Sequence, residues 1–294
     1  MKIKQGFVPA LGTPLTKEGK FLPESMKKHV NDQIEAGAVG LLCMGSMGIE
    51  AFITAEEYPK VAKTTLEAAA GRVPVFVGAM DTSIARVKQR IAPLEDSDVA
   101  AFVFTTPFYS ACNRTQAMNF FRAVAKLTKH NIMIYDLPGV TRCKITYDMV
   151  LELLESVPNF IGIKSADTQM FRKLKLNPNV PKDFITVYSG LDTFDVSYTW
   201  GINNCLDGML SCTPKNTKAL FEALERGDHA TAGTCLSNIV ELRDCFVQYG
   251  VMNAFTVSMN LLGYEGNFAQ DYCPETSPEG VAAVTALMKK IGEL

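Results

Sequence analysis

The chain has 294 residues, of which 47% are apolar and 20% are charged. This composition excludes a disordered or collagen-like chain, and the length is sufficient for a sizeable core. The 29 basic and 31 acidic residues leave a formal charge of −2, so nucleic acid is not expected as a partner, because binding it requires a basic excess. No apolar run approaches the roughly 18 residues that a membrane span needs.

The first residues and the cysteines indicate a cytoplasmic protein. Residues 1–14 include two lysines, but Pro9, Gly12 and Pro14 interrupt the apolar stretch, which favours a first strand over a signal peptide. The eight cysteines show no CxxC spacing and lie mostly in apolar runs, as is typical of buried thiols in a reducing compartment. The three histidines lie far apart, so neither a zinc site nor a hydrolase triad is expected.

Eight short apolar runs recur along the chain, and their lengths suit strands buried on both faces of a parallel sheet. They are residues 7–11, 39–45, 73–79, 99–107, 131–138, 160–165, 184–190 and 204–211. Amphipathic segments between them predict helices over 55–70, 115–128 and 146–156, the first with Thr54 as N-cap and Glu57 three residues on.

This alternation predicts an α/β protein, a (β/α)8 TIM barrel, over residues 1–216. Residues 217–294 read as a C-terminal helical extension, interrupted by a turn-rich stretch near 263–279. The alternative is a doubly wound open sheet with a second helical domain. It is disfavoured because no GxGxxG follows the first strand and no P-loop is present.

In a (β/α)8 barrel the functional residues lie where the strands end. The polar and glycine residues at these ends are Thr13, Gly45, Ser46, Gly48, Thr105, Thr106, Tyr109, Tyr135, Asp136, Lys164, Ser165, Ser189, Gly190, Asp192 and Ser211, with Met47 inside the second group.

Lys164 follows the apolar run 160–163, which would place its amine at the barrel mouth. Desolvation there favours the neutral amine, the form that attacks a carbonyl to give a Schiff base. From position alone, a lysine that pairs with Asp167 is an equally good interpretation.

The ends of two further strands contain residues that would have a catalytic or binding role only together with Lys164. Tyr135 could move a proton at a bound intermediate, although a core tyrosine is the simpler interpretation. Gly45 and Gly48 surround Ser46 and Met47, so backbone N–H groups could converge on a carboxylate, although a tight turn needs the same glycines.

Together the segments 10–14, 45–48, 106–109, 135–138, 162–164 and 189–192 resemble the pyruvate-dependent class I aldolases, the superfamily of N-acetylneuraminate lyase and dihydrodipicolinate synthase. Their order, spacing and strand positions agree with that superfamily. The resemblance implies a lyase that forms or cleaves a carbon–carbon bond between an aldehyde and pyruvate or another 2-keto acid.

The resemblance also implies residue roles. Lys164 forms the Schiff base, Tyr135 exchanges the proton, and Ser46 and Met47 supply N–H groups to the pyruvate carboxylate, with the Ser46 hydroxyl linking Tyr135 to Tyr109. The superfamily needs no metal or organic cofactor. Tyr109 is contributed across a subunit interface in family tetramers, so a homo-oligomer, a homotetramer or a dimer, is expected.

Three further residues complete the expected substrate-binding set. Thr13 and Gly190 lie at the ends of the first and seventh strands. Leu210, together with Met209, suggests a partly apolar pocket wall.

Several positions depart from the family pattern. Met47 replaces a threonine, Asp136 replaces an asparagine and adds a negative charge near the site, and Val140 stands where synthases carry an arginine. Arg142 is close to that position, and Thr193 replaces the acidic residue of the sialic-acid branch. The alternatives are therefore a true 4-hydroxy-tetrahydrodipicolinate synthase, which uses pyruvate and aspartate semialdehyde, and a non-catalytic barrel that binds a small carboxylate.

Overall fold

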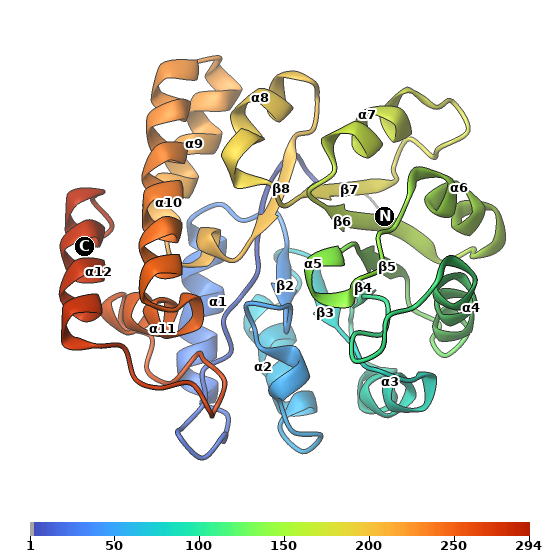
Figure 1. The fold of residues 1–294 in the computed structure, drawn as a ribbon, viewed down its shortest axis with the longest axis horizontal. Helices are drawn as coiled ribbons and strands as arrows, with labels where there is room; N and C mark the ends of the chain where they lie inside the picture. Colours follow the sequence, from blue (N-terminus) through green and yellow to red (C-terminus); the bar gives the residue numbers. More distant parts are fainter. Residues whose placement is uncertain (1–2) are drawn as a thin grey trace.

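The computed structural model describes residues 3–294, in which parallel strands alternate with helices around a central barrel (Figure 1). The strands are β1 (Gly6–Pro9), β2 (Leu41–Cys43), β3 (Val75–Gly78), β4 (Ala101–Phe104), β5 (Ile132–Tyr135), β6 (Phe160–Ser165), β7 (Ile185–Tyr188) and β8 (Asn204–Asp207). Seven lie within the predicted apolar runs and β1 begins one residue before its run, so the strand prediction is confirmed.

The helices fill the connections and the C-terminal region. They are α1 (Pro23–Glu35), α2 (Tyr58–Ala69), α3 (Ile84–Ile91), α4 (Arg114–Ala125), α5 (Pro138–Thr141), α6 (Tyr147–Ser156), α7 (Thr168–Leu176), α8 (Phe194–Thr199), α9 (Pro214–Arg226), α10 (His229–Tyr249), α11 (Val251–Leu261) and α12 (Pro278–Lys290). Short 3₁₀ turns are η1 (Glu50–Phe52), η2 (Ala92–Leu94), η3 (Leu191–Thr193) and η4 (Met209–Ser211).

The sheet closes on itself. Its strand order is β1-β8-β7-β6-β5-β4-β3-β2, with every pair parallel. The remaining edges, β1 and β2, meet at a parallel bridge between Ala10 and Leu42, where the Leu11 N–H donates to the Leu42 carbonyl at 2.9 Å. The chain is therefore a (β/α)8 TIM barrel, as predicted, and the open doubly wound sheet is not formed.

Alternate residues of each strand face two separate apolar layers. The layer inside the barrel contains Val8, Ala10, Leu42, Phe76, Ala101, Val103, Met133, Tyr135, Ile185, Val187 and Leu206. The larger outer layer contains the intervening strand residues, such as Phe102, Ile134 and Ile163, packed against the helices. The inner layer fills the barrel, so polar groups that face inward can be reached only near the ends of the strands.

The predicted helices are present, but one cap differs. The N-cap of α6 is Thr146, whose hydroxyl accepts the Met149 N–H. In the first predicted helix, α2 begins at Tyr58 with Glu57 as its N-cap residue, and the Thr54 hydroxyl accepts the Glu57 N–H at 3.3 Å. The Glu57 carboxylate accepts the Phe21 N–H at 3.2 Å, which ties α2 to the β1–α1 connection.

The C-terminal region is helical with an irregular stretch between α11 and α12, as predicted. The expected boundary between residues 216 and 217 falls inside α9, the helix that follows β8 and covers the barrel beside β1. Glu293 accepts N–H bonds from Lys215 and Asn216, which fastens the end of the chain to the first turn of α9. Within residues 3–294 no helix is long and apolar enough to cross a membrane.

The end of β3 lies unusually close to the loop after β2. A Cβ added to Gly78 would lie 1.9 Å from the Met44 carbonyl oxygen, and Met44 itself has a φ of 54°. The Gly78 carbonyl accepts the Tyr58 hydroxyl at 2.7 Å, which anchors this contact to α2. Gly78 therefore sets how closely the β2 loop approaches the barrel.

We expect Gly78→Ala to lower the free energy of unfolding by about 3 kcal/mol, because the overlap with Met44 forces the backbone apart. Gly139→Ala is the matched control, since nothing lies within 4 Å of its added Cβ, and its effect should stay within about 0.5 kcal/mol. Urea unfolding of both variants measures the difference. Equal stabilities would show that the β2 loop does not depend on this contact.

Candidate active site

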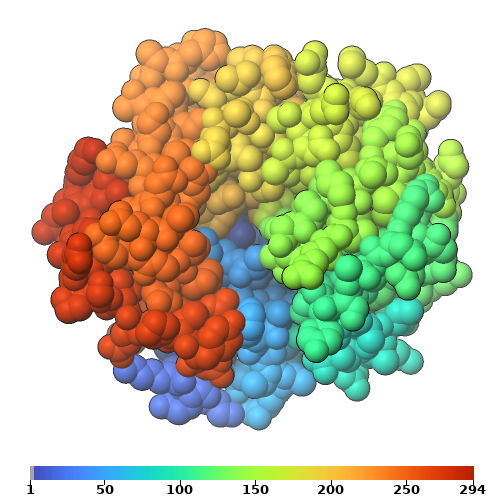
Figure 2. Space-filling view, viewed as in Figure 1, coloured from blue at the N-terminus to red at the C-terminus, as the bar shows by residue number. Residues whose placement is uncertain are grey.

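The carboxyl ends of the strands open into a hollow at the centre of one face of the molecule (Figure 2). Lys164 lies near the end of β6, and its side chain is buried, with only 5% of the residue exposed. Tyr135, the last residue of β5, is the direct register partner of Lys164, so both side chains face the barrel interior at the same level. Two adjacent strands thus place an amine and a phenol side by side.

The amine rests on the face of the phenol ring. The Lys164 Nζ lies 3.9 Å from the centroid of the Tyr135 ring, within the range of a cation–π contact. Below this pair, the inner layer is apolar and leaves little room for water. Such surroundings strengthen electrostatic effects on a bound charged intermediate.

The β2 loop, residues 44–49, supplies backbone donors at the opposite side of the mouth. The N–H groups of Ser46 and Met47 have no backbone acceptor among residues 3–294. The Thr13 hydroxyl donates to the Gly48 carbonyl at 2.7 Å and so connects this loop to the end of β1. Unpaired backbone N–H groups in a tight turn can bind a carboxylate.

The Met47 side chain occupies space beside β8. A Cβ added to Gly208 would lie 2.6 Å from the Met47 methyl carbon, so the glycine makes room for the thioether. Met47 packs on both apolar layers and remains partly exposed. The methionine at the position of the family's threonine therefore adds apolar surface to the mouth.

An ionic cluster supports the β2 loop from behind. The Arg90 Nε lies 3.0 Å from a Glu50 carboxylate oxygen and 2.9 Å from an Asp81 oxygen. Burial raises the pKa of Glu50 well above its usual value, and Arg90 opposes that rise. Burial would also raise the pKa of Asp81, but hydrogen bonds from Arg86, the Thr82 N–H and Arg90 outweigh it, and the pKa is lowered.

Asp136 is turned away from the barrel interior. Its carboxylate accepts the Lys144 ammonium, the Ile145 N–H at 2.9 Å and the Ser165 hydroxyl at 2.7 Å. The Lys144 pKa is raised, because these carboxylate contacts outweigh the opposite effect of burial. Asp136 stands where the family has asparagine, and its negative charge is therefore neutralised within the β5–β6 wall and does not face the site.

The other expected catalytic residues are not brought together within one chain. Ser46 is exposed, and Tyr109, in the loop after β4, is 92% exposed. Neither has a hydrogen bond to Tyr135 among the described residues. A relay through Ser46 and Tyr109 would need rearrangement or a second subunit, and it stays a prediction.

The remaining expected substrate-binding residues have structural contacts. Leu210 is fully buried in the outer apolar layer, and Thr13 is buried at the loop contact described above. Gly190 lies against the Tyr188 ring, whose hydroxyl pairs with the Thr193 hydroxyl at 2.8 Å. Leu210 thus shapes the wall through packing and does not form part of the inner layer.

Asp207, the last residue of β8, is an acidic group near the site that was not among the predicted site residues. Its carboxylate accepts the Met209 N–H at 2.9 Å. Burial raises its pKa, and the positive charge of Lys164 opposes the rise, so the two groups interact electrostatically. The signal was available in the sequence, since Asp207 is an acidic residue at a strand end.

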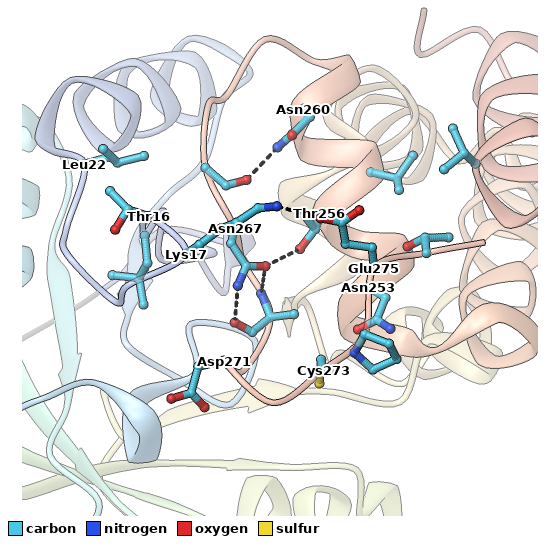
Figure 3. A pocket seen from close by; sticks show the side chains of 17 residues that line it. Thr16, Lys17, Leu22, Asn253, Thr256, Asn260, Asn267, Asp271, Cys273 and Glu275 are labelled. Carbon is cyan, nitrogen blue, oxygen red and sulfur yellow. Dashed lines mark hydrogen bonds and ion pairs between the residues drawn. The ribbon is translucent and has the colours of Figure 1, made fainter. Parts of the chain in front are cut away.

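A separate pocket of about 650 Å³ lies between the β1–α1 connection, α11 and the loop after it (Figure 3). The Asn260 amide donates to the Gly266 carbonyl, and the Asn267 amide donates to the Ala269 carbonyl. Lys17 and Glu275 form an ion pair of 2.7 Å at the rim. These polar groups already pair with one another within the protein and hold the loop, so they do not indicate a ligand site.

The chain is a (β/α)8 barrel with Lys164 and Tyr135 paired at its mouth. The chain belongs to the Dihydrodipicolinate synthetase family, which matches residues 4–286, and it is accordingly a carbon–carbon lyase. The resemblance drawn from the six sequence segments is thus confirmed.

Curated relatives and solved structures agree with this assignment. A 4-hydroxy-tetrahydrodipicolinate synthase of Rhodopseudomonas palustris is 29% identical over 287 residues, which cover 97% of this chain and 96% of the relative. One of Agrobacterium fabrum is 26% identical over 98% of both chains. The structure of Proteus mirabilis N-acetylneuraminate lyase superposes with a TM-score of 0.90 at 19% identity, covering 100% of both chains, and shares the fold.

Proposed function

We propose that this chain is a Schiff-base aldolase that forms or cleaves the bond between an aldehyde and pyruvate, or another 2-keto acid. The observation that carries the proposal is the register pair of Tyr135 with Lys164, which places a phenol against a buried amine. It is supported by curated relatives named for a synthase reaction and by a fold shared with a family protein, YagE of Escherichia coli, whose structure contains pyruvate.

The chemistry begins when the neutral Lys164 amine adds to the ketone carbon of the 2-keto acid. The ketone oxygen leaves as water, and with one proton taken up the product is a cationic imine. This imine accepts an electron pair from a bond on the carbon next to the imine carbon, which gives an enamine. In cleavage the pair comes from the carbon–carbon bond that breaks, and in synthesis it comes from a C–H bond that loses its proton before the new bond forms. The imine is itself the electron sink, so the proposed chemistry uses neither a metal nor an organic cofactor.

Tyr135 is the group placed to move protons. Its phenol lies beside Lys164, within reach of atoms attached to Nζ. The free N–H groups of Ser46 and Met47 would hold the carboxylate, so the substrate would extend across the mouth from β6 to the β2 loop. Binding at both ends fixes the reacting carbon against the phenol.

The aldehyde partner is expected to be small or partly apolar. Met47, Phe108 and Leu137 are partly buried apolar side chains that pack on the inner layer at the mouth. Val140, which stands at the synthase arginine position, is 56% exposed, and the nearby Arg142 is exposed too. Neither offers a buried cation for the second carboxylate of aspartate semialdehyde, so the alternative of a true synthase is less well supported.

We expect the active unit to be a homo-oligomer in the cytoplasm. Tyr109, Phe108 and Pro107 line an open hollow of about 1060 Å³ with Ile84, which is 42% exposed. A tyrosine that is 92% exposed beside other apolar groups suits a subunit interface. All eight cysteines are unpaired, which suits a reducing compartment.

The first test is borohydride reduction in the presence of pyruvate. The wild-type protein should gain a reduced pyruvate adduct, seen as a mass increase on the peptide that carries Lys164. Lys164→Ala should gain none and should lose turnover. Lys144→Ala is a control, because Lys144 pairs with Asp136 outside the barrel interior and should not alter where the adduct forms. An adduct that persists in Lys164→Ala would refute the proposal.

The second test concerns the proton. Tyr135→Phe removes the hydroxyl but keeps the ring beneath Lys164, so kcat should fall by about 100-fold while the imine can still be trapped. Steady-state kinetics and trapping, measured together, separate proton transfer from imine formation. An unchanged kcat would assign the proton transfer to another group.

The third test concerns assembly. Sedimentation should give a mass of two or more times the 32.2 kDa of one chain. Ile84→Arg, on the face that carries Tyr109, should shift the protein toward monomer and reduce turnover, because charge disfavours an apolar interface. Val247→Arg, at a 65% exposed position on α10, serves as the control. A fully active wild-type monomer would contradict the role of Tyr109 across an interface.

A further inference from the structure

A third polar side chain lies at the level of Lys164 and Tyr135. Phe104 of β4 pairs with Ile134 of β5, so the next residue, Thr105, stands beside Tyr135. Ala101 and Val103 belong to the inner layer, whereas Phe102 and Phe104 face outward. Because side chains alternate along a strand, Thr105 faces the barrel interior.

The Thr105 hydroxyl lacks a partner. The residue is 2% exposed, and its Oγ1 has no hydrogen bond in the described structure. Burying a hydroxyl without a partner is costly, and a hydroxyl that also faces the space beside Lys164 is placed to bind a ligand there. The Thr106 hydroxyl is likewise buried and without a hydrogen bond, but the alternation of side chains turns it away from the barrel interior, toward the Cys143 side of the strand.

The position of β4 in the barrel indicates what that ligand is. In the closed order of eight strands, β2 and β6 lie opposite each other and β4 lies midway between them. A molecule attached to Lys164 on β6 and held by the β2 loop would therefore cross the mouth between β4 and β8, the space that Thr105 faces. Neighbouring strands are about 4.8 Å apart, so Thr105, Tyr135 and Lys164 can all act on one small acid.

We propose that Thr105 is a substrate-binding residue whose hydroxyl donates a hydrogen bond to an oxygen of the bound 2-keto acid. The inference rests on the Schiff-base function proposed above. Thr105 is covered to the same degree as Lys164 and Tyr135, which are 5% and 6% exposed. A substrate that reaches the amine therefore also reaches this hydroxyl, once partly buried side chains at the mouth, such as Met47 and Phe108, move aside.

The test compares Thr105→Val with Thr105→Ser. Valine keeps the shape but removes the hydroxyl, so the pyruvate concentration for half-maximal borohydride trapping should rise about tenfold, the equivalent of one hydrogen bond. Serine should restore a value near that of the wild type. Thr106→Val is the matched control and should leave the concentration unchanged, since its hydroxyl faces Cys143.

Equal half-saturation in wild type and a folded Thr105→Val would overturn this inference while leaving the aldolase proposal standing. Absence of any adduct in the wild type would instead refute the aldolase proposal, and this inference with it. If Thr105→Val does not fold, the decision falls to a crystal of the wild type with pyruvate. Hydrogen-bond distance between Oγ1 and a ligand oxygen supports the inference, and a separation beyond 4 Å rejects it.

Discussion

The parallel pairing of β5 with β6 is the interaction on which the site depends. It fixes Tyr135 opposite Lys164, and the alternation of side chains turns both into the barrel. A shift of β6 by one residue would turn Lys164 to the outer layer and bring Ser165 inward, and the same shift of β5 would exchange Tyr135 for Asp136. The hydrogen bond between the Ser165 hydroxyl and the Asp136 carboxylate, on the outer side of the same two strands, stabilises the register that the chemistry needs.

The opposite side of the mouth depends on close backbone contact instead. Gly78 lets the β2 loop approach β3, Thr13 ties the loop to β1, and Arg90 neutralises the buried carboxylates behind it. These contacts leave the N–H groups of Ser46 and Met47 free. The Lys164 amine on β6 and the N–H groups of the loop after β2 together set the length of the 2-keto acid that can bind between them.

Much of this arrangement could be predicted from the sequence. Eight apolar runs predicted the barrel from local pattern, whereas the position of Lys164 left two interpretations open, and only the resemblance of the six segments together favoured a catalytic lysine. The direction of Asp136 could not be predicted, since it depends on Lys144 eight residues later. The unpaired hydroxyl of Thr105 could not be predicted either, because it depends on which groups the neighbouring strands place around it, whereas Asp207 was visible as an acidic residue at a strand end. Helix α2 begins later than expected, at Tyr58, although the Thr54 hydroxyl still accepts the Glu57 N–H three residues on.

The most direct measurement is a crystal structure of the protein soaked with pyruvate. The account predicts continuous electron density between the Lys164 Nζ and the ketone carbon, with the Tyr135 phenol beside the bond and the carboxylate at the N–H groups of Ser46 and Met47. Pyruvate bound elsewhere, or held at the mouth without a bond to Lys164, would contradict it.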